Sequence, residues 1–572
     1  MVVPGQGVVG ERAIDSTQSL LAGLPLLAGA SAATLEALVA HLRPVEVHAG
    51  AVVIRQGDPA DRLFLVRSGR LRVLVDEEDG PRTIRELGAG AAIGELALLT
   101  GSPRSATVQA VRDGELLELD ADVFHALLEN DPAFAISVAR GLARQLQASG
   151  ELLPPSARPS VISVSGIGSV AGAVAFAGQL ADALRGFGSV ALLSSEACGV
   201  ERAAALDHAE REHAFVVLAA AGDEDWSAFC RRQSDRRVVL VTDEPTGAAG
   251  APIPSGADLV FAHGISRAAL ASFLDALEPR AHHHLDPGAS SASVARVARR
   301  LAGRALGVVL SGGGARGFAH IGAIAGLRDA GFEIDRIGGC SIGSFIGAMH
   351  ALGLDPEEMR SRCSDELVRR SPFNDYTLPR VSLIRSRKAG RMLERVFGDE
   401  IVQALPISLF TVSADLLASR TVVHRRGLVL EAVGASMSIP GLVPPLSRPG
   451  HLLVDGGVLN NLPVDVMASD DEGPIVAVDV IRRLDELDMS VAPALPSITE
   501  TLSRATVLGS VERAERNRKL ADFVVTPDVQ DVALREFSAL ERAVSAGHAA
   551  MLAALEAGDA EKLRERLAAA AV

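Results

Sequence analysis

The stretch that decides the fold of this chain reads ALGVVLSGGGARGFAHIGAIAGL over residues 305–327. An apolar run typical of a strand leads into three consecutive glycines, and apolar residues then recur at helical spacing. A glycine turn between a strand and a helix exposes backbone N–H groups at the start of the helix, where negative charge is favoured. The stretch therefore predicts an α/β domain with a turn that stabilises an anion.

The next strand-to-helix junction reads GGCSIGSF at residues 338–345. Ser341 stands in a glycine-x-serine-x-glycine frame, in which Gly339 and Gly343 permit the tight turn that exposes a nucleophilic hydroxyl. Such a turn also places the Ile342 amide beside the position where an oxyanion develops. We interpret Ser341 as a nucleophile. The candidate oxyanion donors are the amides of Gly312, Gly313, Gly314 and Ile342.

A serine nucleophile needs a proton acceptor. Asp455 ends an apolar strand in HLLVDGGVLNNLP, and the following Gly456 and Gly457 let the backbone turn close to another loop. An aspartate buried among apolar groups has a raised pKa and can accept the serine proton directly. His320 is the alternative base, but in the first turn of its helix we expect it to pack or cap. A serine–acid–histidine order would need a histidine after Asp455, where only His548 stands in a helical region.

The glycine-rich turn has one competing interpretation, a dinucleotide-binding turn. A dinucleotide-binding turn requires an acid at the end of the next strand, about 20 residues on. Glu333 and Asp335 stand at the beginning of that strand, and its end is the serine turn. We therefore favour a hydrolase over dinucleotide binding. Arg316, in the same glycine run, either braces the loop, adds positive potential or forms a structural salt bridge.

The elements GGGxRG, GxSxG and Asp-Gly-Gly, in this order, resemble the patatin-like phospholipases, and ASMSIPG at 435–441 resembles that family's loop before the aspartate. The resemblance covers residues 305–530, with the motif core at 307–468. It implies acyl-ester hydrolysis by a dyad of Ser341 and Asp455, without a metal or any other cofactor for catalysis. The residues that support the motifs are Arg316, Gly317, Gly339, Gly343, Gly456 and Gly457.

Residues 45–120 consist of short apolar stretches broken by regular turns, which predicts an antiparallel jelly-roll barrel. Within it, IGELALLTGSPRSATV at 93–108 places Glu95 and Arg104 at a spacing that a short helix bridges. A phosphodiester needs a cation and free amides, and a ribose hydroxyl needs a carboxylate. The stretch resembles the phosphate-binding cassette of cyclic-nucleotide-binding domains, over residues 20–145. That resemblance implies a cyclic nucleotide, with cyclic AMP favoured, as an effector bound at Gly94, Glu95, Leu96, Arg104 and Ser105.

Strand-like runs alternate with helix-length segments after the barrel, which predicts a parallel sheet with crossover helices. SVSGIGSVAGAV at 163–174 resembles a phosphate-binding turn but lacks its lysine, so we expect a degenerate module. Successive histidines in HHHL at 282–285 point to opposite faces of an extended chain, which disfavours a metal site. The expected organisation is a tail at 1–19, a cyclic-nucleotide-binding-like domain at 20–150, a linker at 151–160, a middle α/β region at 161–285, a linker helix at 286–304, a patatin-like domain at 305–530 and C-terminal helices at 531–572.

Barrel, middle α/β region and patatin-like core in one chain resemble the neuropathy target esterase family, in a short form with a single barrel. The resemblance implies a serine esterase that acts on phospholipids or lysophospholipids under control of a cyclic nucleotide. One alternative is an ester or thioester hydrolase of other substrates with a vestigial barrel. A more remote one is a cyclic-nucleotide-responsive regulator without catalysis. A DNA-binding regulator is disfavoured, since a sheet-like region replaces the helix-turn-helix expected after the barrel.

The composition indicates an acidic protein of a reducing compartment. Lys and Arg number 56 against 71 Asp and Glu, and the net charge of -15 argues against broad attraction to nucleic acid or an anionic membrane. Four scattered cysteines show no metal-ligand spacing. The uncharged stretch 159–181 is rich in Gly and Ser, which favours a strand, a turn and a buried helix over a membrane span. We expect a cytoplasmic protein without a secretory signal, peripheral at the inner membrane surface through the basic stretches 291–305 and 385–388.

Overall fold

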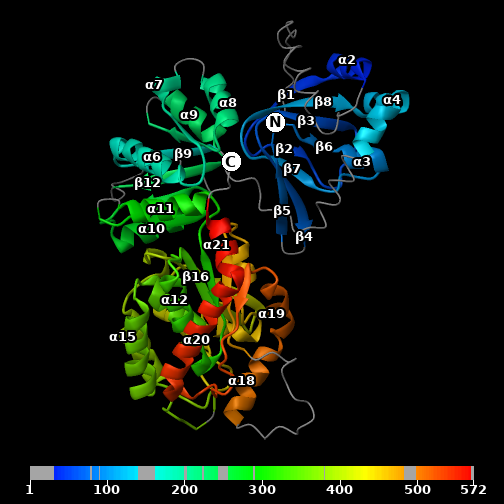
Figure 1. The fold of residues 1–572 in the computed structure, drawn as a ribbon. Helices are drawn as coiled ribbons and strands as arrows, with labels where there is room; N and C mark the ends of the chain where they lie inside the picture. The colour runs from blue at the N-terminus through cyan, green and yellow to red at the C-terminus, as the bar shows by residue number, and fades with distance from the viewer. Residues whose placement is uncertain are drawn as a thin grey trace. The chain divides into compact units, whose positions relative to one another are not determined.

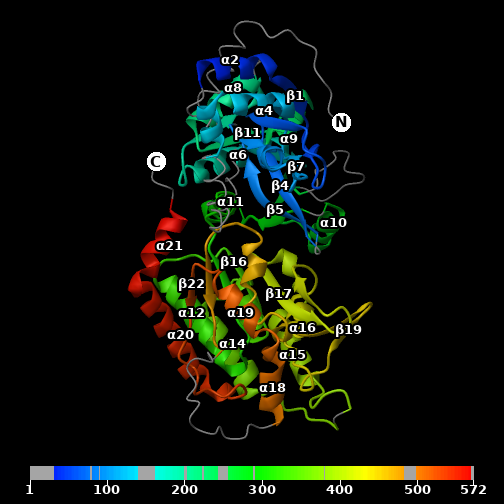
Figure 2. The same cartoon turned by 90° about the vertical axis from the view of Figure 1, so that its right-hand side faces the viewer.

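The computed structural model of this chain consists of two compact units, Met1–Ser165 with Ala191–Arg237 and Gly166–Val190 with Val238–Val572. Figure 1 shows their ribbons and Figure 2 shows the same ribbons turned by 90°. The structure describes residues 31–77, 80–88, 90–139, 161–198, 202–221, 224–242, 256–277, 279–287, 290–378, 380–481 and 498–568.

The first unit begins with two four-stranded antiparallel sheets, ordered β1-β8-β3-β6 and β2-β7-β4-β5. One face of each sheet packs on a shared core that includes Val66, Leu71 and Leu116. Gly69 turns the chain between β3 and β4 with a φ of 95°, and a Cβ there would lie 2.7 Å from the Cα of Gly114. The predicted jelly-roll barrel is confirmed. Its elements are α2 (Ala32–His41), β1 (Arg43–Val47), β2 (Val52–Ile54), β3 (Arg62–Ser68), β4 (Leu71–Glu77), β5 (Gly80–Leu87), β6 (Ala92–Ile93), α3 (Glu95–Thr100), β7 (Thr107–Ala110), β8 (Gly114–Asp120) and α4 (Ala121–Asn130).

Parallel strands with helices follow the barrel, as the alternating pattern predicted. In the first unit β11 lies between β10 and β9 and pairs in parallel with β9. In the second unit β13 lies between β12 and β14 and pairs in parallel with both. The elements are β9 (Val161–Ile167), α6 (Val170–Leu184), β10 (Val190–Leu193), α7 (Ser195–Cys198), α8 (Arg202–Glu212), β11 (Phe215–Ala219), α9 (Glu224–Gln233), β12 (Arg236–Val241), β13 (Asp258–Phe261), α10 (Arg267–Leu277) and β14 (Ala281–His284). The uncharged stretch 159–181 thus contributes β9, a glycine turn and most of α6.

The second unit also holds an eight-stranded sheet, ordered β19-β20-β17-β16-β15-β21-β22, with β18 paired to β17. Its central strands run in parallel, whereas β18, β19 and β20 pair in antiparallel fashion. Parallel neighbours end at the same edge of a sheet, so the glycine run after β15 and Ser341 after β16 come together there. The strands are β15 (Gly307–Leu310), β16 (Arg336–Cys340), β17 (Ser408–Asp415), β18 (Arg420–His424), β19 (Leu446–Arg448), β20 (His451–Asp455), β21 (Ile475–Val478) and β22 (Phe523–Val525).

Helices α12 and α20 lie side by side against this sheet in both views (Figures 1 and 2). Their backbones touch at two glycines, because a Cβ on Gly322 would collide with the Val544 carbonyl and one on Gly547 with the Ala319 carbonyl. Side chains from residues 532–567 therefore share the core of the large sheet. The helices are α11 (Ser291–Leu301), α12 (Ala319–Asp329), α13 (Ile342–Ala351), α14 (Pro356–Cys363), α15 (Arg387–Phe397), α16 (Val429–Ser436), α17 (Val464–Ala468), α18 (Ile498–Leu508), α19 (Val511–Arg518), α20 (Leu540–Ala554) and α21 (Ala560–Leu567).

The arginines of α11 are used inside the second unit. Arg299 binds Asp335 at 2.7 Å, and Arg300 binds Glu472 at 2.7 Å. Burial opposes ionisation of Glu472, but the charges of Arg300 and Arg336 outweigh it and hold the pKa of this carboxyl well below its ordinary value. These contacts fix α11 to the large sheet. They leave little of its positive charge for the membrane contact that we expected from 291–305.

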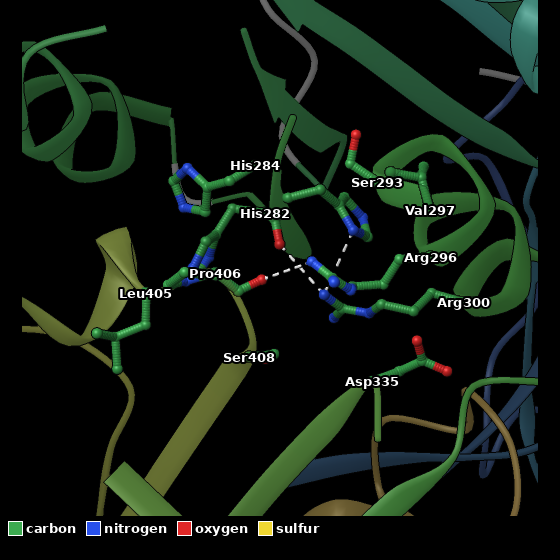
Figure 3. A pocket seen from close by; sticks show the side chains of 11 residues that line it. His282, His284, Ser293, Arg296, Val297, Arg300, Asp335, Leu405, Pro406 and Ser408 are labelled. Atoms are coloured by element: carbon green, nitrogen blue, oxygen red, sulfur yellow. Dashed lines mark hydrogen bonds between the residues drawn. The ribbon is translucent and has the colours of Figure 1, made fainter. Parts of the chain in front are cut away.

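Figure 3 shows a small cavity between β14 and α11, with room for about one water molecule at ≈ 10 Å³. His282 and His284 point to the same side of β14. His284 is hydrogen-bonded through Nε2 to the Gln403 carbonyl at 2.8 Å, and Arg296 donates to the Pro406 carbonyl at 3.0 Å. These histidines thus fix the strand within the unit. Within the described ranges, no group of three or more His, Cys, Asp or Glu side chains is placed to hold a metal.

Candidate active site and nucleotide cassette

Ser341 lies at a sharp turn between the buried strand β16 and helix α13. Its backbone has φ 52° and ψ -122°, a conformation that costs a non-glycine residue about 1–3 kcal/mol. The turn packs directly on the end of β15, since a Cβ on Gly339 would lie 2.7 Å from the Leu310 carbonyl oxygen and one on Gly343 would collide with it. The Ser341 amide donates to Ser436 Oγ at 2.8 Å. The surrounding packing therefore holds the strained turn in place.

The Ser341 hydroxyl donates a hydrogen bond of 2.7 Å to Asp455 Oδ2. The other carboxylate oxygen of Asp455 accepts from the Gly457 amide at 2.8 Å and from the Cys340 thiol at 3.6 Å. Asp455 ends β20, which pairs with β17 next to β16, so the sheet itself brings the two side chains together. Both side chains are buried.

Burial raises the pKa of Asp455 to about 6, although hydrogen bonds from Ser341 and Gly457 favour the carboxylate. The carboxyl group therefore ionises at neutral pH and still holds a proton more firmly than an exposed aspartate. A general base works best with a pKa near the operating pH. The electrostatics fit a group that takes a proton from Ser341 and later returns it.

Neither histidine considered from the sequence lies at the serine. His320 is fully buried, and its Nε2 donates to the Ser311 carbonyl at 2.8 Å. Burial lowers the pKa of His320 to about 4, so its ring is neutral at physiological pH. His548 binds Asp329 at 2.9 Å on the other side of α12 and α20. Both histidines have structural partners.

The glycine run after β15 lies beside Ser341. A Cβ on Gly312 would lie 3.2 Å from Ser341 Cβ, and one on Gly314, where φ is 58°, would collide with the Leu534 carbonyl. The Gly312 amide already donates to the Asn461 carbonyl at 3.1 Å. Within the described residues, the amides of Gly313 and Gly314 have no such acceptor.

Two further motif residues tie the glycine run to its surroundings. Arg316 donates through Nε to the Val532 carbonyl at 2.7 Å. This contact braces the glycine loop. Gly317 packs on the Ile342 side chain, which a Cβ at this position would displace. The glycine run and the serine turn therefore support each other directly.

A cavity of about 640 Å³ opens onto Ser341 and Asp455. Its lining is mainly apolar and also includes several arginines. This volume is typical of sites for small molecules and single lipid chains. The apolar lining residues are Phe373, Met437, Ile439, Leu442, Val443, Val507, Leu508, Val511, Leu534 and Phe537, and the basic ones are Arg316, Arg504, Arg518 and Arg535.

The barrel brings the predicted nucleotide-binding residues together at the start of α3. Gly94 has a φ of 87° and precedes Glu95, and both Glu95 and Arg104 are buried. Arg104 donates to the carbonyls of Gly94 at 3.1 Å and of Arg62 at 2.7 Å, with Asp61 at 3.6 Å. Burial lowers the pKa of Arg104. The guanidinium is therefore engaged by protein groups. The remaining predicted residues, Leu96 and Ser105, are exposed.

Comparison with known proteins decides the family. The model of the patatin-like phospholipases matches residues 308–468, and that of the cyclic nucleotide-binding domain matches residues 44–131. An uncharacterized NTE family protein of Mycobacterium tuberculosis is 34% identical over 96% of this chain and 98% of its own length. The chain belongs to the NTE family. The resemblance to the neuropathy target esterases is confirmed.

Larger NTE relatives contain the same parts. Human patatin-like phospholipase domain-containing protein 6 is 30% identical over 86% of this chain and 40% of its own length. A lysophospholipase of Aspergillus fumigatus is 27% identical over 88% of this chain and 41% of its own length. The chain thus spans about two fifths of these two relatives. This NTE family member is a hydrolase of the patatin-like phospholipase class with a cyclic nucleotide-binding domain. No helix in the described ranges is long and apolar enough to cross a membrane.

Several residues at the NTE family centre were not found from the sequence. Asn461 brackets the glycine run, because its carbonyl accepts from Gly312 and its side-chain amide donates to the Gly312 carbonyl at 3.3 Å. Ser436 accepts from the Ser341 amide, and Cys340 donates to Asp455. The asparagine pair in DGGVLNNLP was a visible signal for Asn461. Ser436 and Cys340 carried no comparable signal.

Proposed function

We propose that this NTE family member hydrolyses acyl esters of phospholipids or lysophospholipids with Ser341 as nucleophile and Asp455 as general base. The observation that carries the proposal is the 2.7 Å hydrogen bond from Ser341 Oγ to a buried carboxylate, at the wall of a largely apolar cavity. A dyad of this kind needs no histidine, because burial has already given Asp455 the proton affinity of a useful base.

In the first step, Ser341 Oγ attacks the ester carbonyl carbon while its proton passes to Asp455 Oδ2. The negative charge that develops on the carbonyl oxygen is held by the amides of Gly313, Gly314 and Ile342. We leave Gly312 out of this set, because its amide is bonded to Asn461. When the tetrahedral intermediate collapses, Asp455 returns the proton to the leaving alcohol and the acyl group remains on Ser341.

In the second step, water attacks the acyl-enzyme. Asp455 accepts a proton from the water, the same amides hold the oxyanion, and collapse of the intermediate releases the fatty acid. The proton then returns to Ser341 Oγ. One carboxylate thus serves both half-reactions, which requires it to release the proton as readily as it takes it.

A lipid substrate is supported by the cavity and by the relatives. Apolar side chains from 437–443 and 507–511 line the cavity, whose volume of about 640 Å³ has room for an acyl chain. The human and fungal relatives are named as a phospholipase-domain protein and a lysophospholipase. We propose a cytoplasmic enzyme that meets membrane lipid transiently and has no catalytic cofactor.

The test is hydrolysis of lysophosphatidylcholine and of a soluble short-chain ester by the full chain. Ser341→Ala should lower turnover of both substrates at least about 10⁴-fold, because the nucleophile is lost. The control is Ser469→Ala, which removes an exposed hydroxyl that donates only to the Val466 carbonyl, and should keep normal activity. If the protein hydrolyses the short-chain ester or a thioester and has no activity on lysophospholipid or phospholipid, the alternative of an ester or thioester hydrolase of other substrates holds. Full activity of Ser341→Ala would refute the mechanism.

We further propose that a cyclic nucleotide, with cyclic AMP favoured, binds at Gly94, Glu95, Leu96, Arg104 and Ser105 and alters ester turnover. Support comes from the family match and from the close approach of Glu95 and Arg104. Within the first unit the barrel is also tied to the following segment, since Arg112 binds Glu210 at 2.7 Å and Asp113 binds Arg232 at 3.1 Å. A ligand that moved the barrel would therefore act on that segment as well.

A further inference from the structure

The segment 369–391 has a charge unlike the rest of the chain. Its sequence RRSPFNDYTLPRVSLIRSRKAGR contains seven arginine or lysine residues and one acid, Asp375, in a protein of net charge -15. Among the ion pairs of the described residues, none involves Arg380, Arg385 or Arg387. This contrasts with α11, whose arginines bind buried acids. Arg369 and Arg370, by contrast, bind Asp365 and Glu366, and Lys388 donates to Asn374. The positive charge that lies outside these contacts is therefore centred on residues 380–387.

The middle of this segment is a hairpin attached to the cavity. Thr377 donates to the Leu383 carbonyl at 3.0 Å, which joins its two arms. Leu383 and Ile384 donate to the carbonyls of Gly441 and Leu442 at 2.9 and 3.1 Å, which fixes one arm to the cavity wall. The Ile384 side chain is fully buried against Leu442. We refer to the described residues of this hairpin, 373–378 and 380–388, as the mouth hairpin.

The opposite side of the mouth hairpin is apolar and exposed. Leu378 and Val381 are 80% and 72% exposed, and Tyr376 also projects outward. Arg535, which lines the cavity, donates to the Phe373 carbonyl at 3.2 Å and to the Tyr376 hydroxyl at 3.1 Å. Exposed apolar side chains this close together are uncommon on a protein that meets only water. The yellow-green loop that precedes α15 lies at the lower end of the second unit in both views (Figures 1 and 2).

We propose that the mouth hairpin docks this protein on an anionic lipid surface, so that the Ser341 cavity opens against the lipid; the inference rests on the proposed lipid hydrolysis. Apolar side chains that enter the interface and cations that bind lipid phosphates are the two contributions that hold peripheral proteins on membranes. Leu378 and Val381 supply the first, and Arg380, Arg385, Arg387 and Lys388 supply the second.

The net negative charge of the whole protein determines how it would meet an anionic surface. An anionic surface repels most of such a molecule and attracts only a segment of opposite sign, so the charge distribution selects one orientation. In that orientation the segment that reaches the lipid is the one bonded to the cavity wall at Gly441 and Leu442. Docking and substrate entry would then occur at the same place.

The experiment measures co-sedimentation of the full chain with vesicles of phosphatidylcholine alone and of phosphatidylcholine mixed with an equal amount of phosphatidylglycerol. The Ser341→Ala protein is used, so that hydrolysis does not consume the vesicles. Arg385→Glu with Arg387→Glu should weaken binding to the mixed vesicles at least about 25-fold, since each basic residue near such a surface contributes about five-fold. Leu378→Asn with Val381→Asn should weaken it about 10-fold.

Matched controls lie on the β17–β18 turn, where Leu417 is 67% exposed and Arg420 is also exposed. Leu417→Asn and Arg420→Glu should leave vesicle binding unchanged. In the active protein, the hairpin variants should keep normal turnover of a soluble short-chain ester and lose turnover of lipid in mixed vesicles. Inactivity of the parent protein on the soluble ester would count against the proposed function alone.

Four outcomes would overturn the docking proposal. They are equal binding to both vesicle types, undiminished binding by the hairpin variants, loss of soluble-ester turnover in those variants, and a change of oligomeric state on gel filtration in place of a change in vesicle binding. The third outcome would make the hairpin a part of the cavity, and the fourth would make it a contact between copies of this chain.

Discussion

The serine centre of the second unit and the nucleotide cassette of the first unit differ in how their polar side chains are used. Ser341 donates to Asp455, its partner in the proposed reaction, so the protein's own contacts already hold the catalytic arrangement. Arg104 donates to the carbonyls of Gly94 and Arg62, so part of its donor capacity is used by the protein itself. A site that is prepared before its ligand arrives loses little free energy on binding, whereas a site that must exchange partners loses more. We therefore expect efficient catalysis and a comparatively weak nucleotide interaction.

The largest expected effect is at the serine centre. Asp455→Asn should lower kcat at least about 10³-fold, because the amide keeps the shape of the carboxyl group and cannot accept the serine proton. The free energy of unfolding of the Asp455→Asn protein at pH 7 should be at least as large as that of the parent. Burial raises the folded-state pKa of Asp455 from 3.8 to about 6, so ionisation above pH 6 costs the folded state about 3 kcal/mol that asparagine does not incur.

Ester turnover and thermal unfolding at pH 7 check both parts of this prediction. His320→Gln is the control, because its ring bonds only to the Ser311 carbonyl, and it should retain most of the activity. Suppose that His320→Gln were inactive with a normal melting temperature while Asp455→Asn stayed active. His320, and not Asp455, would then be assigned as the general base.

The next effect concerns the cassette and should be smaller. Arg104→Ala should weaken binding of cyclic AMP about 30-fold or more, because a buried phosphate loses its cation. Arg67→Ala, which removes a half-exposed partner of Glu115 in the same barrel, is the control and should bind normally. Calorimetry with cyclic AMP and cyclic GMP measures binding, and ester turnover under the same conditions measures coupling. If the parent protein gives no binding heat with either nucleotide, the proposed nucleotide site is wrong. If it binds a nucleotide and ester turnover does not change, the site stands and the proposed regulation is wrong.

The smallest effect is a pH dependence that only the serine centre should show. Asp455 acts as a base when deprotonated, so kcat/KM for a soluble ester should fall about tenfold per pH unit below the Asp455 pKa of about 6 and level off above it. The effect of Asp455 on folding stability has the opposite pH dependence to its effect on kcat/KM. The folded state binds the proton more tightly than the unfolded state, so the protein gains stability as the pH falls from 6 towards 4. A profile that is flat between pH 5 and 8 would contradict the assignment of Asp455 as base.

The sequence predicted the parts of the centre that depend on local backbone geometry. Glycines around Ser341 and after Asp455 force turns at the ends of strands, and adjacent strands of one sheet bring such ends together. The order of the motifs was therefore enough to predict that Ser341 and Asp455 lie side by side, and their side chains are 2.7 Å apart. The family and the barrel followed from motifs of the same local kind.

The sequence could not predict which distant groups would occupy a polar atom. The Gly312 amide donates to the Asn461 carbonyl, and Arg104 donates to the carbonyl of Arg62. Arg300 forms an ion pair with Glu472. Each partner is brought in by tertiary packing, and nothing in the local pattern of either residue indicates the pairing. For the same reason the charge on α11 suggested a membrane-binding helix, whereas the structure uses it inside the unit.

The close packing of Gly339 and Gly343 on Leu310 bears on how this enzyme could evolve. No side chain separates Gly339 and Gly343 of the serine turn from the end of β15, so the distance between Ser341 and the proposed oxyanion donors depends strongly on main-chain contact. Substitution of neighbouring side chains can tune that distance only slightly, and enlargement of either glycine would disrupt it. New substrate preferences would therefore have to arise in the outer walls of the cavity, at 437–443 and 504–511, while the chemistry stays constant.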